Sequence, residues 1–279
     1  KAVDLLGPLV SVEPTTAYRL AASGQTLTLE GAFEPGKRYT VKIASPTQGD
    51  DARKYPRAAT LAVFVPDRRA EAAFAARAGY LGSAGNRTVQ ASVVNMPAVV
   101  VKAYRIYENN LVGWRNYAAG SDWATQRYAQ PLATKTIALA NRKNVPEELR
   151  INLDELLGGK AGDGAYRIVL GTPGEAEGRW WGETSTMVSL SDVGLTAKVM
   201  ADAANPAAQA ALVWAVSLST GQPVANEKVR VYSNKNQLLG EAVTDQDGLA
   251  RVNSMVPAEG ERPAVLVAKE AQGLTWLDL

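Results

Sequence analysis

Residues 211–252 read ALVWAVSLSTGQPVANEKVRVYSNKNQLLGEAVTDQDGLARV. Apolar side chains recur there at every second position, which predicts one apolar face of a β-strand: Leu212, Trp214, Val216 and Leu218. Pro223 lacks a backbone N–H donor and fits a strand edge or entry, and the alternation resumes from Val229. Turn-forming residues cluster at 233–236 and again at 244–248. This order of strands and turns predicts an antiparallel sandwich sheet.

The composition limits the classes of protein that the chain can belong to. Its 279 residues are many for one domain and fit two or three, and 46% of them are hydrophobic. The 30 basic and 28 acidic residues leave a net charge of +2, so no bulk field would attract nucleic acid or an anionic membrane. The sequence has no apolar run of about 18 residues, and no transmembrane helix is predicted.

Cysteine and histidine are both absent from the chain. Disulfides, thiolate chemistry and a Ser-His-Asp triad are therefore excluded, and a metal site would need oxygen ligands alone. We assign no catalytic, cofactor-binding or metal-binding residue, and we expect no cofactor. The chain starts at Lys1 without a methionine or a signal peptide, which suggests a piece of a longer protein.

Three β-rich units are predicted, at residues 1–66, 67–190 and 191–279. The first has about 66 residues, fewer than the roughly 100 of a two-sheet sandwich, which suggests that its opening strands are missing. The second contains the clearest strands, and its irregular stretch at 108–130 predicts an insertion with some helix. The third holds about seven strands, an immunoglobulin-like count. The fold class is all-β, with antiparallel β-sandwich domains in tandem.

Several segments resemble the domains of one protein family. In the third unit these are SDVGLT at 191–196, WAVSLSTGQPVAN at 214–226, TDQDG at 244–248 and GLTWLDL at 273–279. Their order resembles a macroglobulin-like domain of bacterial alpha-2-macroglobulins. FEPGKRYTV at 33–41 and the segment 99–111, ending in Asn-Asn-Leu, resemble the preceding domains of the same proteins. The resemblance covers essentially the whole chain.

The resemblance implies an N-terminal run of macroglobulin-like domains that acts as a scaffold, without enzymatic activity, in a periplasmic protease inhibitor. It implies two kinds of partner: target proteases, engaged by the full-length protein, and neighbouring macroglobulin-like domains of the same chain. Membrane attachment, to the inner membrane, would come only through a lipid anchor outside these residues. Many relatives carry a Cys-x-Glu-Gln thioester, which this cysteine-free stretch cannot hold. The insertion at residues 114–131 is a weak candidate for the bait region that proteases cut.

An alternative function is a carbohydrate- or adhesin-type binding array of the cell envelope. In that case exposed rings would stack on sugars: Trp114, Trp123, Trp180 or Trp181. For the adjacent pair Trp180 and Trp181 we favour an interface role for the ring that faces away from the core. A downstream thioester or bait region would favour the protease inhibitor, and loss of glycan binding in Trp180→Ala would favour the array.

Three further groups of residues are explained more simply by local structure than by a catalytic or metal-binding role. The Asp-x-Asp-Gly sequence at residues 245–248 resembles the start of a calcium loop, but Asn253 and Val256 continue it poorly, so we favour a hairpin turn with Gly248 at positive φ. Asp50 and Asp51 are paired in a polar loop and are expected to be solvated. A solvated sheet face is predicted for Lys228, Arg230 and Lys235.

Overall fold

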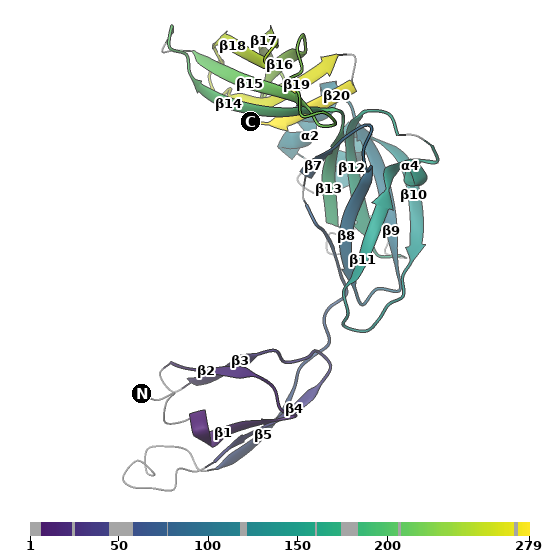
Figure 1. Ribbon diagram of the computed structural model, residues 1–279, viewed down its shortest axis with the longest axis vertical. Coiled ribbons are helices and arrows are strands. Elements are labelled where there is room, and N and C mark those ends of the chain that lie inside the picture. Colours follow the sequence, from purple (N-terminus) through teal and green to yellow (C-terminus); the bar gives the residue numbers. More distant parts are fainter. Residues whose placement is uncertain are drawn as a thin grey trace. The chain divides into compact units, whose positions relative to one another are not determined.

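The computed structural model describes residues 7–23, 26–44, 58–76, 78–117, 122–159, 161–173, 184–205, 208–270 and 273–279 (Figure 1). Most of the regular structure in these residues is antiparallel β-sheet, which confirms the predicted all-β class. Contacts divide the chain into two compact units. Unit 1 comprises residues 1–70 and 142–145, and unit 2 comprises residues 71–141 and 146–279. The predicted boundary between residues 190 and 191 falls inside unit 2 and stays a prediction.

Unit 1 has two layers of strands, which face each other in Figure 1. One layer is a three-stranded sheet in the order β1 (Val10–Glu13), β4 (Arg38–Ile43) and β5 (Ala59–Phe64). The other is the hairpin of β2 (Tyr18–Ser23) and β3 (Thr26–Gly31). The buried side chains between them are Val10, Val12, Tyr39 and Val41. The alternating positions of β1 and β4 therefore supply the core, as period-2 burial requires.

The first sandwich of unit 2 pairs a large sheet with a small one. The large sheet has the order β10 (Ala129–Ala138), β9 (Ala98–Ile106), β12 (Gly164–Gly171), β13 (Thr184–Leu190) and β7 (Ala78–Leu81). The small sheet has the order β11 (Glu147–Asn152), β8 (Thr88–Val94) and β6 (Glu71–Phe74). Side chains such as Val101, Ile168 and Ile151 fill the space between them. A short helix, α4 (Leu153–Leu157), follows β11 and was not predicted; the side chain of Asn152 caps its first turn.

The second sandwich of unit 2 contains seven described strands, which agrees with the predicted count. One sheet has the order β14 (Val193–Ala201), β15 (Gln209–Ser217) and β18 (Leu249–Met255). The other has the order β17 (Leu238–Val243), β16 (Lys228–Ser233), β19 (Pro263–Glu270) and β20 (Gly273–Asp278). The prediction that successive strands of residues 211–252 form one sheet was wrong, because the chain crosses to the other sheet after β15 and back after β17.

The buried face of β15 differs from the face that the apolar alternation suggested. Leu212 is 39% exposed and Trp214 is 47% exposed, whereas Val213 and Ala215 are fully buried. Both faces of this strand are apolar, so alternation alone could not distinguish them. The neighbouring strand β18 determines which face of β15 is buried, because Val213 pairs with Ala250, which lies in the same core. Among the described residues, no helix is long and apolar enough to cross a membrane.

Candidate functional site

A helical insert separates β9 from β10, as the irregular stretch at residues 108–130 predicted. It consists of η3 (Glu108–Asn110), α2 (Leu111–Tyr117) and α3 (Asp122–Tyr128). The two helices pack closely because residue 113 is glycine: a Cβ there would lie 2.5 Å from the Tyr128 ring. The Asn110 side chain donates to the Tyr128 carbonyl over 3.1 Å and satisfies one of the free acceptors at the end of α3. The insert is therefore a built element with its own internal contacts.

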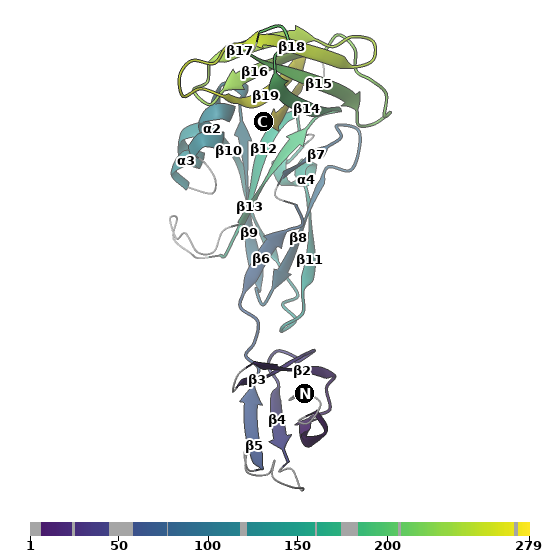
Figure 2. The same cartoon turned by 90° about the vertical axis from the view of Figure 1, so that its left-hand side faces the viewer.

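The insert lies between the two sandwiches of unit 2, below β16 and β19 in Figure 2. Its buried side chains Leu111, Val112 and Trp114 belong to one apolar cluster with residues of the second sandwich. These residues are Ala264, Val265, Val267 and Leu274. Strand β19 is consequently buried on both faces, since Leu266 and Ala268 belong to the inner core of its own sandwich. We call the cluster that contains Trp114 and Val267 the joint core.

Arg167 on β12 lies under the insert with only 2% of its surface exposed. Its guanidinium carbon is 5.0 Å from the centre of the Trp114 ring, an arrangement that favours a cation–π interaction. The same guanidinium donates to the hydroxyl of Thr125 on α3. Arg167 therefore contacts both helices of the insert and fixes them to the large sheet.

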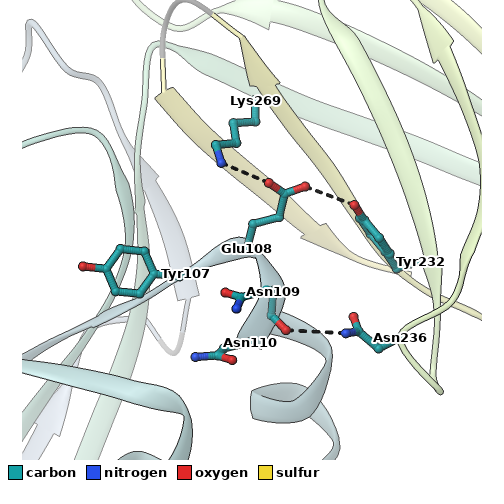
Figure 3. Close-up of a pocket in the computed structure, with 7 residues that line it drawn as sticks. All are labelled: Tyr107, Glu108, Asn109, Asn110, Tyr232, Asn236 and Lys269. Carbon is teal, nitrogen blue, oxygen red and sulfur yellow. Dashed lines mark hydrogen bonds and ion pairs between the residues drawn. The ribbon is translucent and has the colours of Figure 1, made fainter.

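Glu108, at the start of the insert, accepts three polar contacts from the second sandwich, and Figure 3 draws those from Tyr232 and Lys269. The Tyr232 hydroxyl donates over 3.1 Å, Arg230 Nη1 lies at 3.3 Å and Lys269 Nζ at 3.2 Å. Burial, and then the negative charge of Glu108, raise the pKa of the Tyr232 hydroxyl. The carboxylate forms one wall of an open cleft of about 600 Å³. We call this group the Glu108 cluster; its donors all come from β16 and β19.

Further polar contacts connect the second sandwich of unit 2 to the insert and to the first sandwich. The Tyr80 hydroxyl on β7 donates to the Trp276 carbonyl on β20 over 2.9 Å, and burial raises the pKa of Tyr80 to about 12. Arg115 on α2 forms an ion pair with Asp278. At the passage from β13 to β14, Asp192 accepts hydrogen bonds from the side chains of Ser217 and Ser219. These bonds tie the connection between β13 and β14 to the end of β15.

In the turn at residues 245–248, the Asp245 carboxylate is engaged by the backbone of the turn itself. Asp245 Oδ1 already accepts from the backbone N–H groups of Asp247 and Leu249, both over 2.9 Å. Gly248 has the expected positive φ, 73°. The turn connects β17 to β18, however, and these strands pair with other strands in different sheets, so it is not the predicted hairpin. Groups of three or more acidic side chains that could hold a metal ion are absent from the described residues.

The tryptophans proposed as sugar platforms have different surroundings. Trp114 is buried within the joint core and cannot stack on a ligand. Trp123 is exposed and contacts Arg127 and Tyr128. Trp180 and Trp181 lie outside the described residues, as do Asp50 and Asp51.

Two other predicted surfaces have different environments from those expected. The candidate bait region at residues 114–131 includes α3 and the second half of α2, and Trp114, Ala124 and Thr125 within it are buried. The solvated face predicted for Lys228, Arg230 and Lys235 was wrong for Arg230, because Glu108 and Glu241 both lie within ion-pair distance of it. Sequence reasoning missed this interface: Glu108 is 122 positions from Arg230 along the chain, and no motif connects them.

Comparisons with known proteins agree with this architecture. The family description for the bacterial alpha-2-macroglobulin MG3 domain matches residues 190–279. The structure is similar to Escherichia coli alpha-2-macroglobulin spanning domains MG0-NIE-MG1, with a TM-score of 0.61, 19% identity and coverage of 98% of this chain and 86% of that one. No curated protein matches the sequence.

Two structures of longer proteins are also similar. The Y1175G mutant of Salmonella alpha-2-macroglobulin has a TM-score of 0.64 and 18% identity, with 98% of this chain and 16% of that chain covered. Trypsin-activated Escherichia coli alpha-2-macroglobulin has a TM-score of 0.56 and 20% identity, with 75% of this chain and 14% of that chain covered. The chain thus spans about one sixth of the Salmonella protein. At these identities the likeness shows the fold.

Proposed function

We propose that this chain, whose residues 190–279 match the MG3 domain of bacterial alpha-2-macroglobulins, is a rigid scaffold segment of a periplasmic protease-trapping protein of that family. In this proposal the segment performs no catalysis. It holds its sandwiches in fixed positions so that the rest of the protein can act on an attacking protease.

The joint core is the observation that carries the proposal. It joins the two sandwiches of unit 2 through side chains that are almost fully buried, including Val112, Val265 and Val267. Exposing one such aliphatic side chain costs about 1.5–3 kcal/mol. Separating the sandwiches would expose several at once, at a cost on the order of 10 kcal/mol. Two sandwiches connected only by a flexible linker would have no such cost, so the joint core favours a frame over a chain of independent domains.

The finer parts of the proposal rest on the family. Proteases are the proposed partners, because a relative of the same family has been solved in a trypsin-activated form. We further propose the periplasm as the location, attachment to the inner membrane by a lipid anchor outside these residues, and domain boundaries at residues 66/67 and 190/191.

The test uses the full-length protein with a variant that breaks the joint core, Val267→Asp. Trypsin would be added, and its cleavage of a large protein substrate would be compared with its cleavage of a small chromogenic one. We expect the wild type to protect the large substrate selectively and the variant to lose most of that protection. The exposed-site variant Val256→Asp is the matched control, since Val256 is 62% exposed. Equal protection by Val267→Asp and the wild type would contradict the scaffold role.

A second candidate, the sugar-binding array, retains one observation in its favour. Trp123 is exposed, and its ring lies beside Arg127. Stacking of a sugar on this ring would give glycan binding that Trp123→Ala abolishes and Trp123→Phe partly retains. A glycan array probed with the wild-type chain and both variants tests this candidate. Absence of any binding by the wild type would remove it.

A further inference from the structure

The two layers of unit 1 differ in width by one strand. Three strands form one layer, β1, β4 and β5, whereas the facing layer has only β2 and β3 among the described residues. The Tyr18 hydroxyl of β2 donates to the Val10 carbonyl of β1 over 2.6 Å, which places β2 against β1. Leu27 and Leu29 of β3 pack against the cluster that contains Tyr39 and Val41 of β4, so β3 lies towards β4. No described strand lies over β5.

The register of the sheet shows that β5 carries an uncovered part of the core face. Val63 pairs with Tyr39, and Leu61 pairs with Val41. Directly paired residues point to the same face of a sheet, so all four side chains face the hairpin layer. Tyr39 and Val41 are buried there, but Leu61 is 53% exposed and Val63 is 44% exposed. Apolar cover therefore extends over β4 and ends before β5.

The backbone of the hairpin layer is open beside this uncovered face. Strand β3 pairs only with β2 among the described strands, so its other edge offers unpaired N–H and C=O groups. Such an edge is a template for an added strand. Natural sheets often protect edges with prolines, charges or bulges. The sequence of β3, TLTLEG, contains no proline and one charge, Glu30, and its pairing with β2 has no bulge.

We propose that unit 1 binds an extended β-strand from a separate polypeptide segment, which pairs with the free edge of β3 and covers Leu61 and Val63. The binding strand needs apolar side chains at every second position, because Leu61 and Val63 are two residues apart on the same face. Its outward side chains would lie beside Thr28 and Glu30, which are exposed on β3. Hydroxyl and ammonium groups fit those neighbours, and Glu30 favours a lysine over an acidic residue.

Within β5 itself, no charge opposes an apolar strand. The segment Ala59–Phe64 reads ATLAVF and contains neither a charged residue nor a proline. An added strand of about six residues would match β3 in length, which is also the usual length of a strand in globular proteins. It would make the hairpin layer three-stranded, equal to the layer opposite.

The test is a binding experiment on the 279-residue chain with a designed peptide, Lys-Val-Thr-Val-Thr-Val-Lys, blocked at both ends. The chain is isotope-labelled, and NMR follows backbone amide signals and their hydrogen exchange. We expect saturable binding, with amide exchange in Thr26–Gly31 slowed at least tenfold. A peptide whose first threonine is replaced by proline should not bind, because proline cannot complete the ladder.

Two matched variants locate the binding face. Leu61→Arg adds a charge on the uncovered face and should weaken peptide binding at least tenfold. Ala62→Arg places the same charge on the opposite face of β5, where Ala62 pairs with Thr40, and should change the affinity less than twofold. Both positions are solvent-exposed, and thermal unfolding of each variant confirms that the fold is retained.

Several results would overturn the proposal. These are no binding at millimolar peptide, equal binding to Leu61→Arg and wild type, or protection of Ala59–Phe64 in place of Thr26–Gly31. Sedimentation of the free chain adds another. Self-association that Leu61→Arg abolishes would assign the face to a second copy of the chain and would also overturn the proposal.

Discussion

Leu266 and Val267 are neighbours on β19, yet they belong to two different apolar cores. Leu266 packs inside the second sandwich with residues such as Val229, whereas Val267 packs in the joint core with the insert. Adjacent side chains on a strand point to opposite faces, so one strand can serve both cores only if both its faces are covered. The insert provides the second cover, and β19 is buried along its described length between Ala264 and Ala268.

This division of β19 leads to the first prediction. Val267→Asp places a carboxylate in the joint core and leaves the inner core of the sandwich intact. A charge buried without a partner destabilises by roughly 3–5 kcal/mol, or the interface opens to hydrate it. We expect calorimetry to show one transition for unit 2 in the wild type and two in the variant. Val256→Asp should leave a single transition. A single transition at the wild-type temperature in Val267→Asp would contradict the prediction.

The second prediction concerns the Glu108 cluster. Glu108→Gln removes the negative charge that Arg230 and Lys269 face, and we expect a loss of about 1–3 kcal/mol in unfolding free energy. The same change should lower the pKa of Tyr232, because the charge of Glu108 contributes to raising it. The measurement is the alkaline absorbance titration of tyrosinate, with Tyr232→Phe identifying the signal. An unchanged titration in Glu108→Gln would show that burial alone sets this pKa.

The third prediction is an alkaline instability that depends on Tyr80. Its folded pKa of about 12 lies above the usual value near 10, because burial disfavours the tyrosinate. The resulting contribution to stability is complete below about pH 10 and is lost as the pH rises towards 12. Tyr80→Phe removes the hydrogen bond to the Trp276 carbonyl, at about 1 kcal/mol near neutral pH. Urea unfolding at pH 7 and pH 11 should show a smaller pH-dependent loss in the variant than in the wild type.

Two glycines with nearly the same φ give the fourth prediction. Gly248 has φ 73° and Gly221 has φ 71°, but a Cβ at Gly248 would lie 2.4 Å from the Ala215 carbonyl oxygen, whereas nothing lies within 4 Å at Gly221. Valine at either position carries the strain of positive φ, about 1–3 kcal/mol. We expect Gly248→Val to cost clearly more than Gly221→Val in thermal unfolding, because it also forces the backbone of β15 to move.

Calcium provides a separate check on the same turn. Because Asp245 Oδ1 already accepts two backbone hydrogen bonds, added calcium should leave the melting temperature unchanged. A rise of several degrees that Asp247→Ala abolishes would show that the turn binds the metal.

The strands were predictable where one face is apolar and the other polar. The clear period in residues 88–95 gave β8, since Val89, Ala91 and Val93 are buried and the residues between them are mostly exposed. The period could not choose a face on β15, where Val213 and Trp214 are both apolar, because the choice depends on the partner strand β18.

The joint core and the polar contacts around it could not be predicted in detail. The stretch at residues 108–130 indicated an insertion, but its partners lie far away along the chain. Tyr80 and Trp276 are 196 positions apart, and Glu108 and Tyr232 are 124 positions apart. Such contacts follow from how two sandwiches pack on the insert, and no local periodicity or short motif encodes them. Arg230 shows the consequence: strand alternation placed it correctly opposite Val229 and Val231, but gave no sign that a carboxylate would cover it.

The fifth prediction is that this chain alone neither captures a protease covalently nor shields one. Covalent capture through a thioester needs a cysteine thiol, and the sequence has none. A cut in the insert would also release little, because Leu111, Trp114 and Ala124 are held in the joint core while the strands on either side keep their own ladders. Incubation with trypsin or elastase should give no denaturant-resistant adduct on a gel. The protease should cleave a large protein substrate and a small chromogenic one with the same ratio of rates whether the chain is present or absent. A stable adduct, or selective loss of large-substrate cleavage, would place trapping machinery within these residues and contradict the scaffold role.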